Sequence, residues 1–386
     1  MNEPQSVREI VVRRLQTVSP SLAEALRICP LRGLLSRSTG PNDYVLGNPK
    51  AWLGTAYHSV LERAASGSCG INSDDPIGSL WAIAIDRLYR DARTHPLNKR
   101  FGSPEHWPGY HVALAGVRLR VTEAYPGRRP RTAAPASTQP PVSSVREERF
   151  TACGGKLVGR PDLVEGDAIV DYKSGAVFDE TAEGPSIKAG YARQLRIYGF
   201  LAHENLSQWP TRGVLLPMLG ERAEIDLTPD ACRDEAEAAV AMLDAVNARM
   251  GSASGPLNLA SPAAAGCGGC PYRIICPGYW ESVTHAWAGN GRYGDAEGIM
   301  QADATRVHGG VAYALHLTVE RGSVAAGPNV ISPLASSIHE DAGQCAAGTK
   351  VRITGLCVRH NGQLAPTLYT VVKRTADLPT ISLGSS

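Results

Sequence analysis

Apolar residues recur at two different spacings along this chain, and each spacing predicts a different kind of element. Between Leu22 and Cys29 they follow the spacing of one face of a helix, behind the pair Ser19 and Pro20, which is typical of a helix start. We therefore predict a helix that ends at Pro30. Helical spacing also predicts helices over residues 52–65, over two stretches between residues 75 and 125, and over residues 231–250.

Strand patterns dominate the middle of the chain. Residues 168–173 begin as an apolar run, end in Asp171 and Lys173, and are followed by the breakers Ser174 and Gly175. A preceding segment over residues 156–164 is interrupted before Asp162, and a tight turn would return the chain antiparallel beside it. This hairpin should bring Asp162 towards Asp171. A further buried strand is predicted over residues 212–219.

Strict alternation of apolar and polar residues returns in the last quarter of the chain, beyond a glycine-rich boundary over residues 288–298. It runs from Val311 to Val319 and recurs at Val351 and Ile353. We predict a small all-β domain over residues 299–386, whose sequence resembles an OB-fold barrel, a platform for single-stranded nucleic acid. A barrel with only a packing or protein-docking role is an equal alternative.

Composition narrows the class of protein. The chain has 386 residues, 43% of them hydrophobic, which suggests two domains with ample apolar content for a core. A net charge of +2 is too small to indicate nucleic-acid binding by the whole surface, so any such binding would depend on local clusters of basic residues. Since no apolar run approaches the ~20 residues of a membrane span, we expect a cytoplasmic protein with no membrane partner. Nine cysteines in that setting favour metal ligands or buried thiols over disulfides.

Two further stretches precede the central strands: a connector and a helical region rich in basic residues. Residues 126–144 are rich in Pro, Ala and Ser and should form a flexible connector. The helical region before them should be an insert that covers one side of the sheet. Its basic residues could line a groove for a nucleic-acid backbone or simply be solvated surface; they are Arg87, Arg90, Arg93, Lys99, Arg100, Arg118 and Arg120.

Two carboxylates and an amine that converge at a sheet edge can support metal-assisted hydrolysis of a phosphodiester. Asp162 and Asp171 could hold a hard divalent cation, and Lys173 could orient or acidify the attacking water. The alternative is that Asp171 and Lys173 form only an ion pair at a strand end. Gln194 and Tyr198 follow, four residues apart and therefore on one face of a helix.

The run GRPDLVEGDAIVDYKSG, followed by QLRIY, closely resembles the PD-(D/E)XK nucleases of the RecB, AddB and Cas4 type. The phrase GTAYHSVLE around His58 resembles the first motif of the same family. The resemblance covers about residues 15–285. It implies an α/β, restriction-endonuclease-like core with a helical N-terminal part and a helical insert.

The same resemblance assigns roles to particular residues. The catalytic residues would be Asp162, Asp171, Lys173, Gln194 and Tyr198, and the metal ligands would be His58, Asp162, Asp171 and Tyr172. An imidazole among oxygen ligands would admit Mn²⁺ as well as Mg²⁺. Glu148 is a further candidate, because a glutamate before the first aspartate sometimes joins the metal shell in this family.

Cys267, Cys270 and Cys276 have the spacing C-x2-C-x5-C, a strong sign of thiolate ligation. His285 could complete a zinc site. The nuclease resemblance instead implies Cys29, in RICPLR, as the fourth ligand of a [4Fe-4S] cluster that staples the start of the chain to the end of a nuclease domain over residues 1–288. The remaining cysteines should be ordinary thiols: Cys69, Cys153, Cys232, Cys345 and Cys357.

Two functions of different classes follow. In the first, the chain is a divalent-metal-dependent DNA nuclease, an exonuclease acting on single strands or DNA ends in repair, recombination or phage defence. In the second, it is a cluster-stapled, single-stranded-DNA-binding subunit of a larger helicase–nuclease or defence complex. No Walker A sequence occurs in the chain, so any helicase motor would belong to a partner. The intact Asp162, Asp171 and Lys173 favour the first function.

Overall fold

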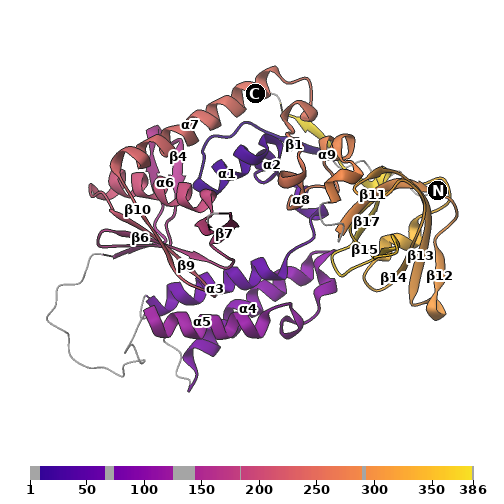
Figure 1. The fold of residues 1–386 in the computed structure, drawn as a ribbon, viewed down its shortest axis with the longest axis horizontal. Helices are drawn as coiled ribbons and strands as arrows, with labels where there is room; N and C mark the ends of the chain where they lie inside the picture. The colour runs from indigo at the N-terminus through magenta and orange to yellow at the C-terminus, as the bar shows by residue number, and fades with distance from the viewer. Residues whose placement is uncertain (1–8, 66–73, 125–143, 183, 289–292, 385–386) are drawn as a thin grey trace.

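The computed structural model describes residues 9–65, 74–124, 144–182, 184–288 and 293–384 (Figure 1). The chain begins with strand β1, Glu9–Val12, and helices α1, Pro20–Ile28, and α2, Pro30–Leu35. The predicted helix start is confirmed, because the Ser19 side chain accepts a hydrogen bond from the Leu22 N–H at 3.2 Å. The predicted connector over residues 126–144 lies outside the described residues, apart from Ser144.

A five-stranded mixed sheet forms the centre of the first part, in the order β10-β9-β6-β5-β2. The strands are β2 (Ser144–Arg146), β5 (Leu163–Glu165), β6 (Ala168–Lys173), β9 (Arg212–Pro217) and β10 (Ala223–Asp226). Strand β6 is antiparallel to β5, with Leu163 opposite Val170, and parallel to β9. The predicted hairpin and the predicted strand after residue 211 are therefore confirmed.

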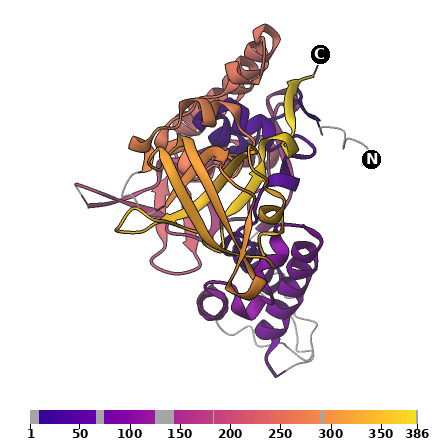
Figure 2. The same ribbon diagram turned by 90° about the vertical axis from the view of Figure 1, so that its right-hand side faces the viewer.

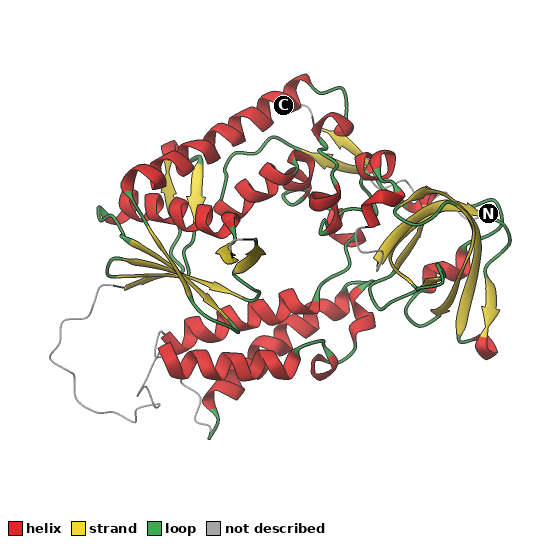
Figure 3. Ribbon diagram, in the orientation of Figure 1, coloured by secondary structure: helices red, strands yellow, loops and turns green. Residues whose placement is uncertain are grey.

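Helices cover both faces of this sheet, which gives a three-layer α/β/α arrangement (Figure 3). Apolar residues of α1, α6 (Ala189–Leu206) and α7 (Pro229–Ser252) share one core with Ile169 of β6. On the opposite face, α3 (Pro49–Ala65), α4 (Pro76–Thr94) and α5 (Tyr110–Ala124) enclose Tyr172. Ile169 and Tyr172 are three residues apart, so they point to opposite faces of β6 and enter different layers, as strand geometry requires.

Two short hairpins flank the sheet. In the first, β3 (Phe150–Ala152) pairs with β4 (Leu157–Gly159), and in the second, β7 (Phe178–Thr181) pairs with β8 (Gly184–Ile187). Gly159 allows α6 to approach β4, since a Cβ there would lie 2.5 Å from Leu201 Cδ1. The break predicted before Asp162 is therefore real, because the residues before it belong to a separate hairpin.

Helix α3 corrects one expectation about its own start. It was expected over residues 52–65, but it begins at Pro49, so Gly54 lies well inside it. A Cβ on Gly54 would stand 2.6 Å from the Ser174 side chain. The glycine therefore lets the helix bearing His58 pack closely against the end of β6.

The last part of the chain is an all-β unit, as predicted, with a sheet in the order β12-β13-β11-β15-β16. Strands β14 and β17 add to it by pairing with β13 and β15. The strands are β11 (Tyr293–Met300), β12 (Thr305–Val307), β13 (Ala312–Gly322), β14 (Gly327–Ala335), β15 (Lys350–Val358), β16 (Leu364–Ala365) and β17 (Val371–Arg374).

The expected glycine-rich boundary over residues 288–298 is in large part strand β11, so the unit begins before residue 299. Gly298 allows β11 and β13 to approach each other, since a Cβ on it would lie 2.3 Å from the Thr318 carbonyl oxygen. The final strand, β18 (Thr380–Leu383), leaves the unit and pairs in parallel with β1 (Figure 2). The two ends of the described chain are thereby joined.

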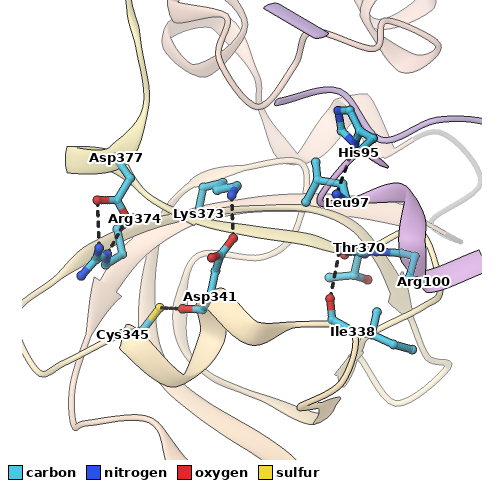
Figure 4. A network of polar contacts seen from close by, with 10 residues as sticks. All are labelled: His95, Leu97, Arg100, Ile338, Asp341, Cys345, Thr370, Lys373, Arg374 and Asp377. Carbon is cyan, nitrogen blue, oxygen red and sulfur yellow. Dashed lines mark hydrogen bonds and ion pairs between the residues drawn. The ribbon is translucent and has the colours of Figure 1, made fainter. Parts of the chain in front are cut away.

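The β unit also docks on the helical insert through buried polar contacts (Figure 4). The half-buried Arg100 guanidinium donates to the carbonyl oxygens of Thr370 at 2.6 Å and Ile338 at 3.2 Å. Burial lowers the pKa of Arg100 to about 10, although the Asp341 charge opposes the shift. None of the described helices is long and apolar enough to span a membrane.

Candidate active site

The end of β6 places a carboxylate and an amine on the side of the sheet that faces α6. Residues alternate along the strand, so Asp171 and Lys173 share that side while Tyr172 faces α3. Asp171 is buried and forms an ion pair with Lys173. The Lys173 ammonium also lies 4.5 Å from the centre of the Tyr191 ring.

Gln194 of α6 fixes both partners of this ion pair. Its side-chain oxygen accepts from Lys173 Nζ at 2.8 Å, and its Nε2 donates to Asp171 Oδ1 at 3.2 Å. One turn further, Tyr198 OH accepts from the same Nε2 at 3.3 Å. Burial, with the Asp171 charge, raises the pKa of Tyr198 far above its ordinary value, so the phenol stays protonated.

Asp162 lies immediately before β5 and reaches the same place, as the predicted hairpin requires. Its Oδ2 accepts from the Tyr172 backbone N–H at 2.6 Å, and its Oδ1 lies 3.4 Å from His58 Nδ1. Burial disfavours the charged form of His58, but the hydrogen bond to Asp162 and the charges of Asp162 and Asp171 raise its pKa on balance. The structure thus brings together His58, Asp162, Asp171, Lys173, Gln194 and Tyr198.

Tyr172 occupies a different position from these polar side chains. Its ring is buried against Tyr57, with ring centres 6.1 Å apart, and against His58, with centres 5.8 Å apart. The ring therefore supports the helix that carries His58. It does not enter the carboxylate group.

Glu147 also belongs to the site, and the choice of Glu148 is corrected. Glu148 is exposed, whereas Glu147 lies beside Asp162. Burial, together with the charges of Asp162 and Glu62, raises the pKa of Glu147 to about 7. Glu147 follows the last residue of β2 and has a positive φ of 48°. The sequence shows two adjacent glutamates, and only this turn decides which one faces inward.

The electrostatics of the group suit a bound cation. Burial, together with the Asp162 charge, raises the pKa of Asp171 to about 6 in spite of Lys173. Asp171 Oδ2 is buried and accepts no hydrogen bond within the described structure, with the Lys173 ammonium as its countercharge. Burying neighbouring carboxylates is energetically unfavourable, and such an arrangement is typical of a site that is completed by a metal ion. Among the described residues, no group of three or more His, Cys, Asp or Glu side chains lies close enough together to hold a metal ion.

Comparison with known families gives an independent finding. The model of the PD-(D/E)XK nuclease superfamily matches residues 17–277, about two thirds of the chain. The chain belongs to the PD-(D/E)XK nuclease superfamily. No curated protein matches it. Superfamily members are generally metal-dependent nucleases, and the matched range includes every site residue named above.

The matched range also includes the three cysteines of the C-x2-C-x5-C motif and the cysteine between α1 and α2. Cys29, Cys267, Cys270 and Cys276 line one pocket, although Cys29 is more than two hundred residues away in sequence. The structure records all four as free thiols. Burial raises the pKa of Cys276 to about 12 and also raises the pKa values of Cys267 and Cys270.

The loop that carries these cysteines is bound to the β unit. Arg273 donates to the carbonyl oxygens of Gly268 at 2.6 Å and Cys270 at 3.2 Å, and its Nε donates to Asp295 at 2.7 Å. The buried Asp295 belongs to β11 and also accepts from Tyr279 OH at 2.7 Å. His285, the expected zinc alternative, is exposed and is not among the residues that line the cysteine pocket.

The basic residues expected to line a groove on the helical insert are mostly engaged elsewhere. Arg90 and Arg118 pair with acids of the insert, Lys99 pairs with Glu340, and Arg100 docks on the β unit. Arg120 is buried and donates to the Pro217 carbonyl oxygen at 2.8 Å. The expected groove is therefore not formed by this set as a whole.

Proposed function

We propose that this chain is a divalent-metal-dependent DNA nuclease of the RecB, AddB and Cas4 type, acting as an exonuclease on single strands or DNA ends. The observation that carries the proposal is the convergence of Asp162, Asp171 and Lys173 under the side chain of Gln194. An ion pair with a merely structural role would not need a second carboxylate, that of Asp162, beside it. Repair, recombination and phage defence are the settings in which this activity would serve.

Each side chain has a distinct task in this proposal. His58, Asp162 and Asp171 would hold Mg²⁺ or Mn²⁺, with Glu147 beside Asp162; a contribution from Tyr172 would fall to its main chain, since its ring is packed. The bound ion would polarise the phosphate and lower the pKa of a water molecule. Lys173 would orient that water, and Gln194 holds the Lys173 ammonium in place through a hydrogen bond.

The test is cleavage of a labelled single-stranded oligonucleotide by the purified chain. Cutting should require Mg²⁺ or Mn²⁺, stop with chelator, and leave 5′-phosphate ends. Asp171→Ala and Lys173→Ala should each lower the rate by at least about 100-fold without unfolding the protein. Asp167→Ala is the matched control, because Asp167 is an exposed acid on the turn between β5 and β6, paired with Arg212 at 3.1 Å. Undiminished cutting by both site variants would refute the proposal.

We further propose that Cys29, Cys267, Cys270 and Cys276 hold a [4Fe-4S] cluster. Four thiols in one pocket have the soft donor chemistry that such a cluster takes, one thiolate for each iron. Burial raises the pKa values of Cys267, Cys270 and Cys276, so these three thiols would favour the protonated form unless a bound cation neutralised them. A cluster there would supply a structural link between α1 and the end of the matched domain.

A further inference from the structure

A polar pocket of about 920 Å³ lies on the N-terminal side of the molecule, apart from the carboxylate group. Its walls are β1, the segment that leads from β1 into α1, the turn after α2, Arg149 just before β3, and Val158 of β4. Four guanidiniums line it, from Arg13, Arg14, Arg37 and Arg149, against the two carboxylates of Glu9 and Asp43. The pocket is therefore a local cationic cluster in a chain whose net charge is only +2.

These guanidiniums are not used to hold the fold together. All four residues are exposed, and within the described ranges none of them has a carboxylate partner. Arg37 makes one long hydrogen bond, 3.4 Å, to Ser19 Oγ. Arg14 leans on the end of α7, where a Cβ on Gly251 would lie 2.7 Å from it. Arg13, Arg37 and Arg149 remain available, unlike most of the basic residues on the helical insert.

The chemistry of the lining favours phosphate over nucleobase. Guanidiniums bind phosphate oxygens in pairs, and Gln16, Ser38 and Thr39 add neutral hydrogen-bonding groups. The aromatic residue in the lining is Tyr44, which is only 9% exposed and offers no open ring for stacking. A ligand held here would be recognised by its backbone and not by its sequence.

The pocket is connected to the carboxylate group by a short stretch of chain. Arg149 lies two residues after Glu147, so at most about 7 Å of extended backbone separates them. The Arg160 guanidinium, with a side chain that is 61% exposed, lies 4.0 Å from the Glu147 carboxylate. Basic groups thus extend from the acids of the site to the pocket.

We propose that this pocket binds the phosphate backbone of a single strand of nucleic acid next to the phosphate that is cut. The proposal rests on the nuclease function and extends it, because it assigns the binding of the flanking nucleotides to Arg13, Arg37 and Arg149. Binding there is independent of sequence and sensitive to salt.

The experiment measures binding of a fluorescent oligothymidine by the full-length chain in an Asp171→Ala background, over a range of salt concentrations. Arg13→Gln, Arg37→Gln and Arg149→Gln are introduced together. Each arginine that neutralises a phosphate should contribute about 0.7 to the slope of log affinity against log salt. The slope of the triple variant should therefore be shallower by about 2, and its binding at low salt at least about tenfold weaker. Thermal unfolding is measured in parallel to confirm that the variants are folded.

The control carries the same change of charge at exposed arginines elsewhere. Arg212 pairs with Asp167, Arg222 pairs with Glu224, and Arg233 pairs with Asp230 at the start of α7. The control should keep the parent slope and affinity. Equal losses in both triple variants would show a general charge effect and overturn the inference, as would no loss in the pocket variant or no binding by any chain. Metal-dependent cutting by the unaltered chain separately decides whether the nuclease function stands.

Discussion

At the scale of single residues, the carboxylates of Glu147, Asp162 and Asp171 lie close together on or immediately next to the neighbouring strands β2, β5 and β6, and this affects the protonation of Glu147 and Asp171. Burial and mutual repulsion raise the pKa of Glu147 to about 7 and that of Asp171 to about 6. Each of these groups therefore binds a proton more readily in the folded chain than in the unfolded one. In the absence of a metal, stability therefore falls as the pH rises from the ordinary carboxyl pKa of about 4 to these raised values, and it levels off above them.

The first residue-scale prediction concerns Glu147→Gln in protein treated with chelator. Above pH 7 the wild-type carboxyl is ionised beside Asp162, whereas glutamine stays neutral. The variant should be more stable at pH 8 by roughly 1 kcal/mol, after allowance for screening by solvent. At pH 4.5 the wild-type carboxyl is protonated and the difference should vanish. Thermal unfolding at the two pH values measures it.

Glu148→Gln is the matched control, because Glu148 is the exposed neighbour. It should leave stability unchanged at both pH values. If Glu148→Gln reproduced the effect at pH 8 and Glu147→Gln did not, the placement of Glu147 in the site would be wrong. With Mg²⁺ or Mn²⁺ present, the sign for Glu147→Gln should reverse, since the ion would be stabilised by the carboxylate that the variant lacks.

At the scale of elements, prolines place the cysteines. Cys29 and Cys276 each precede a proline that begins a helix, α2 in one case and α9 (Pro277–Ser282) in the other. The residue before a proline is held in extended backbone, and both cysteines have that conformation, with ψ values of 117° and 112°. Cys267 lies in the short helix α8, Ala264–Gly268. The prolines thus set the backbone conformation of Cys29 and Cys276, two of the cysteines whose thiols line the same pocket.

The element-scale prediction is that Cys29→Ala lowers iron content, thermal stability and nuclease activity together. The anaerobically purified wild-type chain should contain roughly four irons and absorb broadly near 400 nm. The variant should lose most of this iron, because one of four ligands is missing. Iron and absorbance are measured per chain. Stoichiometric zinc without iron in the wild type would favour a zinc site.

Cys232→Ala is the control for the loss of a thiol. Cys232 is fully buried on α7, and a Cβ on Gly199 would lie 2.8 Å from its sulfur, so its removal leaves a small void and costs about 1 kcal/mol. Some loss of stability with full iron is therefore expected from this variant. Full iron in Cys29→Ala would break the proposed link and leave the fourth ligand unidentified.

At the scale of the whole molecule, the β unit joins parts of the chain that are distant in sequence. It contacts the helical insert through Arg100 and the cysteine loop through Asp295. Arg352 reinforces the second junction, with its guanidinium 5.2 Å from the Trp280 ring and a hydrogen bond of 3.2 Å to the Ile274 carbonyl. The β unit therefore has an internal docking role. An OB-like barrel that binds single strands stays a prediction.

The whole-molecule prediction concerns the junction with the insert. Arg100→Ala should leave the carbonyl oxygens of Ile338 and Thr370 without their donor and cost about 1–3 kcal/mol. Hydrogen exchange should quicken around these residues. Lys99→Ala is the adjacent control, because its ion pair with Glu340 is exposed and should contribute less than about 1 kcal/mol. Equal effects of the two variants would show that the buried contacts of Arg100 do not hold the β unit.

The sequence by itself determined the local elements and the identity of the chemistry. Ser19 and Pro20 set a helix start, and the run that ends in Asp171 and Lys173 set a strand with its polar groups on one face. These features depend on neighbouring residues and on the fixed periods of helix and strand. The order of the motifs was enough to indicate the nuclease superfamily, which the family comparison confirmed.

Tertiary structure alone decided which polar groups come together in the site and which form structural contacts elsewhere in the fold. Glu147 and Glu148 are equivalent in sequence, and the positive φ at Glu147 turned only that carboxylate towards Asp162. In sequence, Arg100 and Arg120 resemble surface cations. In the structure, each donates a hydrogen bond to a carbonyl oxygen more than ninety residues away and is partly or fully buried there. Such pairings depend on contacts between distant segments. The free energy of burying a charge depends on the groups that neutralise or solvate it, and a local sequence pattern does not specify those groups.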